Sequence, residues 1–170
     1  MRRTLVAVWG VAGVLALLGQ AIWRLAPLAI EALASDLGGA HWVFLAGWVA
    51  FMAHAEGWRG FHCRVSPRVV ARARHLAEHP RPLSVALAPL YCMSLFGASR
   101  RGVIVARIVF VGVLGLILVV RTLPQPWRGL VDAGVVVGLG IGALSIVYYG
   151  LRAFMGARLP VGPDLPATAR

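Results

Sequence analysis

Long apolar runs separated by clusters of arginine constrain this 170-residue chain more than any other feature. Four of the runs approach the length of about twenty residues that a helix needs to cross a bilayer. The composition agrees, because 59% of the residues are hydrophobic and only 14% are charged, unlike a soluble domain. The sequence therefore predicts an all-α, multi-pass integral membrane protein. Its predicted spans are residues 4–23, 40–57, 102–120 and 133–151.

A fifth apolar run, residues 83–99, is short and has Pro89 near its middle. Runs of this kind often lie at the membrane interface or enter and leave the bilayer on one side. We therefore interpret residues 83–99 as a re-entrant or interfacial segment. The predicted fold is a four-helix transmembrane bundle, with five spans as the alternative.

The distribution of arginines predicts how the chain is oriented. All 17 basic residues are arginines, which is typical of GC-rich bacterial genomes. With four spans, every arginine except Arg24, Arg121 and Arg128 falls on one side of the membrane. Basic loops are retained in the cytoplasm, so this side is cytoplasmic. We expect a bacterial inner-membrane protein with both termini in the cytoplasm.

The cytoplasmic segment between the second and third spans predicts an amphipathic helix over residues 66–79. Ser66 and Pro67 are a typical helix start, and Pro80 ends the helix. The apolar side of this helix is expected to rest on the inner leaflet. Its arginines would bind anionic lipid headgroups or a partner protein; they are Arg68, Arg72 and Arg74.

The domain organisation is simple. Residues 1–157 are predicted to form a single transmembrane domain. Residues 158–170 are rich in proline and small residues, and we expect them to form a disordered tail.

Ionisable side chains gather around the cytoplasmic end of the second span. Such groups are costly at membrane depth and often mark function there. His54 shares a helical face with Ala46 and Ala50, so we expect it to point into the bundle. The alternative is a purely structural role, in which a Glu56–Arg59 ion pair holds the end of the helix. The candidate functional polar cluster comprises His54, Glu56, Arg59, His62, Cys63, His75 and His79.

His75, Glu78 and His79 match the HxxEH spacing of one class of metalloproteases. The match is weak, because nothing in the sequence supplies a clear further ligand. The chain also lacks phosphate-binding, dinucleotide-binding and haem-attachment motifs. The sequence therefore predicts no catalytic residue, no cofactor and no metal.

Three glycines of the last predicted span recur at every fourth position: Gly134, Gly138 and Gly142. Small residues at this spacing allow helix backbones to approach closely in a membrane. We expect a tightly packed partner helix on this face, from the same chain or from a second copy.

These observations favour a small accessory, assembly or scaffold subunit that acts through helix packing and a basic cytoplasmic face. The alternatives are an oligomeric transporter or channel that uses His54 and Glu56, and an inner-leaflet membrane enzyme with a histidine, cysteine and glutamate site. The sequence leaves enzymatic activity open but favours a protein that is not an enzyme. The expected partners are anionic lipids and a homo-oligomer or larger membrane complex; no groove-reading motif accompanies the positive charge, which argues against nucleic acid.

Overall fold

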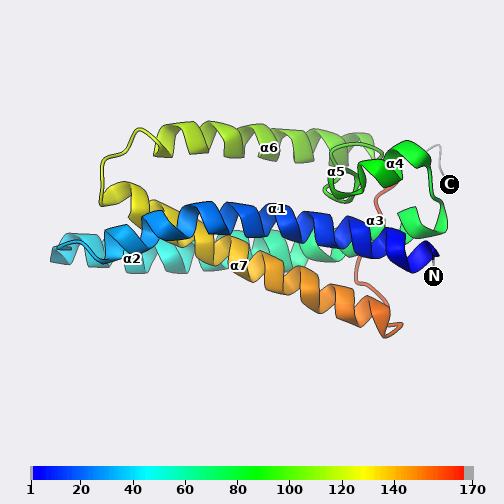
Figure 1. Cartoon of the computed structure of the whole chain (residues 1–170), viewed down its shortest axis with the longest axis horizontal. Coiled ribbons are helices and arrows are strands. Elements are labelled where there is room, and N and C mark those ends of the chain that lie inside the picture. Colours follow the sequence, from blue (N-terminus) through cyan, green and yellow to red (C-terminus); the bar gives the residue numbers. More distant parts are fainter. Residues whose placement is uncertain (1, 167–170) are drawn as a thin grey trace.

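The computed structural model describes residues 2–166, and this part of the chain contains helices and no strands (Figure 1). The helical elements are α1 (Arg2–Leu33), α2 (Gly39–Met52), the π-helix η1 (Ala53–Val65), α3 (Ser66–Glu78), α4 (Pro82–Ala86), α5 (Ala88–Cys92), α6 (Arg100–Val120) and α7 (Trp127–Phe154).

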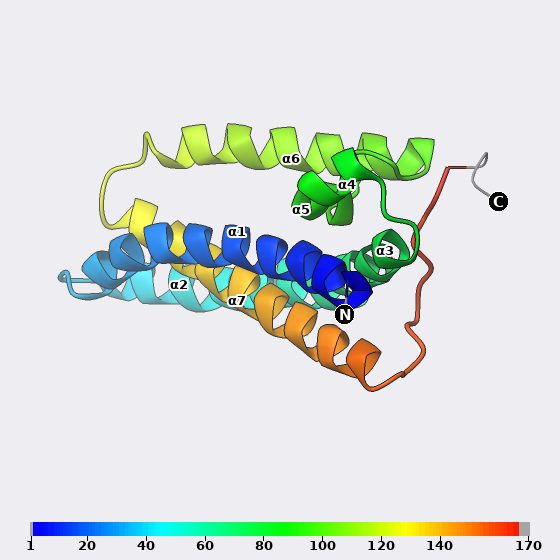
Figure 2. The same ribbon diagram turned by 45° about the vertical axis from the view of Figure 1, so that its right-hand side comes forward.

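The segment from Gly39 to Glu78 is one continuous helical rod that changes its hydrogen-bonding pattern twice. Ala53 and Ser66, at the two junctions, both have right-handed helical backbone angles. Within η1 the turns are wider, and the Ser66 N–H donates to the carbonyl of Phe61, five residues earlier. The rod runs back alongside α1, and α7 packs against both (Figures 1 and 2).

Three helices of the described residues are long and apolar enough to cross a membrane: α1, α6 and α7. The prediction of a multi-pass membrane protein is therefore supported. The second predicted span, residues 40–57, does not form one long apolar α-helix. Its α-helical part ends at Met52 after 14 residues, and the more polar η1 follows. The full four-helix transmembrane bundle is not confirmed.

Residues 83–99 fold into two helices of about one turn, α4 and α5, followed by an irregular turn. Leu87 separates the two helices, and α5 packs against α1 and α3. Gly97 has a φ of +63°, a left-handed conformation that glycine adopts without steric cost. The structure confirms neither a membrane span nor a re-entrant loop in this segment.

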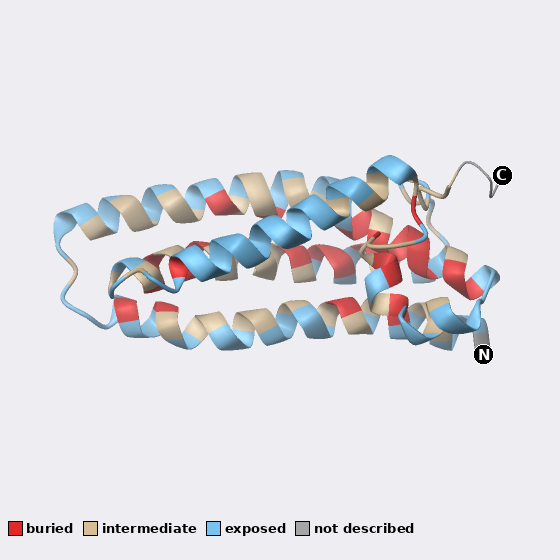
Figure 3. Ribbon diagram, turned by 90° about the horizontal axis from the view of Figure 1, so that it is seen from above, coloured by how far each residue is buried: buried red, intermediate tan, exposed pale blue. Residues whose placement is uncertain are grey.

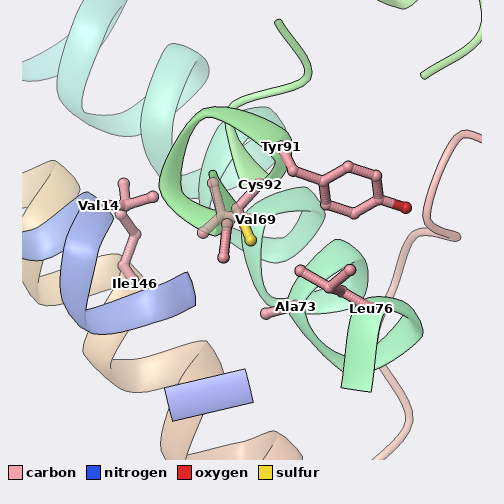
Figure 4. Packing of buried hydrophobic residues seen from close by; sticks show 8 residues of the cluster. Val14, Val69, Ala73, Leu76, Tyr91, Cys92 and Ile146 are labelled. Carbon is pink, nitrogen blue, oxygen red and sulfur yellow. The ribbon is translucent and has the colours of Figure 1, made fainter. Parts of the chain in front are cut away.

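The apolar stripe of α3 faces other helices of the same chain, and this corrects the expectation that it rests on lipid. Val69 and Leu76 belong to a buried cluster with Val14 of α1 and Ile146 of α7 (Figure 4). Tyr91 and Cys92 of α5 close the same cluster. The stripe is covered by protein because α1, α5 and α7 converge on α3.

The glycine face of α7 packs against the rod formed by α2 and η1. A side chain at Gly142 would come within 2.6 Å of the Phe61 ring, and one at Gly138 within 3.0 Å of Glu56 Oε2. At Gly134 it would collide with the indole of Trp48, whose Nε1 donates to the carbonyl of Val131 at 3.0 Å. The partner helix of this face therefore belongs to the same chain.

The remaining long helix, α6, stands apart. It packs along no other helix in the described part of the chain. Most of its apolar side chains are exposed, Val103 and Ala106 near its start are half-buried, and only Val120 at its end is buried (Figure 3). The helix lies at the top of Figure 1 and comes forward in Figure 3 as a nearly unbroken pale blue ribbon.

The C-terminal segment after α7 has no regular secondary structure as far as residue 166. It nevertheless makes defined contacts, since the carbonyl of Asp164 accepts a hydrogen bond from the Ser99 N–H at 2.9 Å. The predicted disordered tail, residues 158–170, lies partly outside the described residues. Its described part contacts the helical body.

Candidate functional site

The polar segment that the sequence singled out coincides with η1. A π-helix is rare, and one of 13 residues is much longer than the single-turn bulges that are usually found. Such bulges frequently occur at functional sites, because they redirect side chains that an α-helix would place elsewhere. The unusual backbone conformation of residues 53–65 therefore points to the same segment as its polar side chains do.

Two ionisable residues of η1 face α7. His62 Nδ1 lies 3.0 Å from the hydroxyl of Ser145, and the His62 ring stacks on Trp58 with centroids 4.5 Å apart. Glu56 lies one and a half to two turns away and packs against Gly138. We call this line of contacts the η1–α7 seam; it comprises Glu56, His62, Ser66, Gly138, Gly142 and Ser145.

The glycines of α7 make this seam possible. Without a side chain at Gly138, the Glu56 carboxylate can lie directly against the α7 backbone. Likewise the Ser66 hydroxyl donates to the carbonyl of Gly142 at 3.4 Å. The small residues thus serve two purposes, since they bring the helices together and leave room for polar groups between them.

Another buried acid lies near the opposite end of α7. Asp132 is 4% exposed, and its Oδ2 lies 4.0 Å from Arg128 Nε, one turn earlier. Neither atom has a hydrogen-bond partner among the described residues. The contact is therefore an ion pair without the short, aligned geometry that makes such pairs strong.

The other cluster residues of η1 point away from the helical body. His54 is exposed, so the prediction that it points into the bundle is wrong. Ala46, Ala50 and His54 do share one face, but Trp48 and Met52 occupy the side that packs on α7. Arg59 is exposed as well, and no Glu56–Arg59 ion pair forms in the described residues. Cys63 is a free, exposed thiol.

Arg72 has a different role from the predicted lipid contact, because its side chain is completely buried. Its Nε donates to the carbonyl of Tyr91 at 2.7 Å, and its Nη2 donates to that of Phe96 at 2.8 Å. Its Nη1 donates to the carbonyls of Pro163 at 2.9 Å and Asp164 at 3.3 Å. We call this arrangement the Arg72 anchor.

The anchor joins three segments that are distant in sequence: α3, the turn after α5, and the C-terminal segment. The guanidinium also lies over the Tyr91 ring, 4.0 Å from its centroid, which adds a cation–π contact. Burial lowers the pKa of Arg72 from its ordinary value, while the neighbouring Tyr91 and Asp164 oppose that shift. An arginine at such a site stays charged, so its carbonyl contacts replace the water it has lost.

The two other predicted surface arginines lie nearer to solvent. Arg68 is half-buried and Arg74 is exposed. They remain available for a headgroup or a partner, which Arg72 is not.

The last two cluster residues lie at the far end of α3, away from η1. His75 and His79 stack with ring centroids 4.7 Å apart, and Glu78 lies beside them. Burial, followed by the charge of His79, lowers the pKa of His75 from its ordinary value. The seven predicted residues therefore do not form one site: Glu56 and His62 lie in the seam, His75 and His79 lie together elsewhere, and the others are exposed.

Sequence reasoning missed the Arg72 anchor, although a signal was present. Val69, Arg72 and Leu76 are spaced three and four residues apart and therefore lie on one face of a helix. It also missed the close contact of α1 with α5. A side chain at Gly10 would come within 2.9 Å of Cys92 Sγ, and one at Gly13 would collide with Pro89.

Comparison with protein-family models, with curated proteins and with solved structures finds no match for this chain.

Proposed function

We propose that the protein is an accessory, assembly or scaffold subunit of a bacterial inner-membrane complex. The observation that carries this proposal is the isolation of α6. In the membrane, lipid would cover the apolar surface of α6, but a helix that packs along no other helix of the described residues is also free to pack against another subunit. We propose that α6 is the helix by which the protein joins its complex.

The position of the arginines supports the proposed orientation. The start of α1, the end of α3, the start of α6 and the end of α7 lie at the same end of the molecule (Figure 1). Arg3, Arg101 and Arg152 are at this end, whereas Arg24 and Arg128 are toward the other. By the positive-inside rule, the arginine-rich end is cytoplasmic, and so are both termini. The α2–η1 rod would then complete a fourth crossing.

A photo-crosslinking scan of α6 tests the proposed docking. A photoreactive amino acid would be placed at each position from 108 to 118 in turn, and the adducts would be separated by mass in native membranes. A partner helix contacts one face, so a discrete protein adduct should appear with a period of about 3.6 residues. Position 146 of α7, which is fully buried within the chain, is the control and should give no intermolecular adduct. Adducts with lipid alone at all eleven positions would contradict the proposal.

The η1–α7 seam supports a second candidate, an oligomeric transporter or channel. A carboxylate and an imidazole between membrane helices are the groups that proton relays use. The candidate residues change with the structure, because His54 is exposed while Glu56 and His62 face α7.

Proton flux into liposomes tests this candidate. Glu56→Gln should abolish flux, and His54→Ala should leave it unchanged as the exposed control. Absence of flux in the unmodified protein, or equal flux in Glu56→Gln, would remove the candidate.

A further inference from the structure

The end of α3 carries three potential metal ligands that the proposed function does not use. One ligand atom from each of His75, Glu78 and His79 lies within 4.8 Å of the other two. His75 is half-buried, and Glu78 and His79 are exposed. The chain therefore partly covers His75, while Glu78 and His79 are accessible from solvent.

The helix itself brings these ligands together. His75 and Glu78, at positions i and i+3, lie on one face of α3, and His79 follows directly as the capping residue, with a non-helical φ of −126°. Ligand atoms that lie about 2.1 Å from a tetrahedral zinc ion are about 3.4 Å apart. In the structure the three ligand atoms lie within 4.8 Å of one another and the two imidazole rings are stacked, so the side chains must rotate to bring both ring nitrogens and the carboxylate onto one ion.

Among the described residues, the three side chains make no ion pair and no side-chain hydrogen bond with another residue. The sequence places Glu78 one turn after Arg74, at a spacing that favours an ion pair. Within residues 2–166 that pair does not form, and the carboxylate instead lies with the two imidazoles. Neither imidazole has a side-chain hydrogen bond to another described residue. The HxxEH spacing alone does not reveal whether the three side chains are occupied by other contacts, and the structure shows them without such contacts among the described residues.

We propose that His75, Glu78 and His79 bind a divalent transition-metal ion of the zinc type. Two imidazoles and one carboxylate are the donor set of three-ligand zinc sites, which keep a fourth position for water or another ligand. The set has too few oxygens for calcium or magnesium and no thiolate to select copper(I). The positive charges of the nearby Arg72 and Arg81 oppose the binding of a cation, so the donors set the affinity and these neighbours reduce it.

The site is independent of the proposed docking through α6. It would give the cytoplasmic end of the protein a metal with an open position, to which a ligand from a partner or from solvent can bind.

Competition with a chromophoric zinc chelator tests the proposal. The full chain would be purified in mild detergent with a tag that contains no histidine. The unmodified protein should bind one equivalent of Zn²⁺, and His75→Ala and His79→Ala should each weaken binding at least tenfold. Glu78→Gln should weaken it less, because the amide oxygen can still coordinate but its charge is lost.

Two matched controls address the other potential ligands. His54→Ala removes an exposed histidine from η1, and Cys63→Ser removes the exposed thiol. Neither variant should change the affinity. Absence of saturable binding, equal binding by His79→Ala, or loss of binding only in Cys63→Ser would overturn the proposal. Matching unfolding transitions for all variants would establish that the differences arise at the site.

Discussion

The helices α6 and α7 resemble each other in hydropathy but differ in how far the rest of the chain covers them. Both are long and apolar. Within an apolar stretch of 18 residues in each helix, 39% of the residues of α7 are buried but only 6% of those of α6. The more apolar helix is thus the less buried one. Hydropathy predicts entry into the membrane, where lipid is as apolar as a leucine side chain, and it does not predict contact between helices.

The small residues explain the difference. In α7, Gly134, Gly138 and Gly142 form one face, and α2 and η1 lie directly on it. In α6, Gly112 and Gly115 are three residues apart among bulky aliphatic side chains, and a side chain at either would meet nothing within 4 Å. A contact surface in lipid needs complementary shape, and of these two helices only α7 provides it to other described residues of the chain.

The largest expected effect compares two arginines that both donate to carbonyls of the turn after α5. Arg72 is completely buried and donates to four carbonyls, in α5, in that turn and in the C-terminal segment, while Arg107 of α6 is exposed and donates to one, that of Leu95 at 3.4 Å. Arg72→Met should lower the free energy of unfolding by about 3–5 kcal/mol, because it leaves buried carbonyls without donors. Arg107→Met should cost less than about 1 kcal/mol. Unfolding in mixed micelles by titration with a denaturing detergent measures both, and equal losses would break the comparison.

The next effect compares two isoleucines. Ile146 of α7 is fully buried, and Ile117 of α6 is 45% exposed. Ile146→Ala should cost about 2–4 kcal/mol, because the cavity it leaves is enclosed by α1 and α3. Ile117→Ala should cost well under half of that in the isolated protein. A large loss for Ile117→Ala in detergent would indicate that α6 is packed in solution.

Alanine substitutions at two glycines should have smaller effects on the free energy of unfolding, and the two effects should differ in sign. Gly142→Ala places a methyl group 2.6 Å from the Phe61 ring, and this overpacking should cost about 1–3 kcal/mol. Gly112→Ala meets nothing and should stabilise the helix by up to about 1 kcal/mol. The same unfolding assay applies, and a stabilising Gly142→Ala would contradict the packing of α7 described above.

The smallest effect is chemical and needs no substitution. Burial raises the pKa of the Cys92 thiol to about 12, whereas Cys63 is exposed. At neutral pH a maleimide reagent should therefore label Cys63 in the folded protein and Cys92 only after unfolding, as mass spectrometry would show. The neutral Cys92 thiol stabilises the folded state fully below about pH 9, and this contribution is lost as the pH rises toward 12. Rapid labelling of Cys92 in the native protein would show that the packed region opens.

Parts of the candidate site could be predicted and others could not. The concentration of ionisable residues between His54 and Cys63 was evident, because charge is rare in membrane segments. Which of them face α7 was not evident, since the wider turns of η1 shift the helical register and the sequence carries no sign of a π-helix. Arg72 was assigned to the membrane surface because arginines usually lie there, although its spacing from Val69 and Leu76 also fitted the buried face.

The sequence by itself determined the class of this protein. Runs of apolar residues about as long as the hydrocarbon core of a bilayer is thick, with arginines between them, allow little besides membrane helices, because backbone groups in lipid must be satisfied within a helix. Only the tertiary structure decided which apolar surfaces meet. It covers α3 with protein, encloses Arg72 with backbone carbonyls and leaves α6 alone. The reason is that close contact depends on the shape of two surfaces brought together from distant parts of the chain, and hydropathy along one helix contains only half of that information.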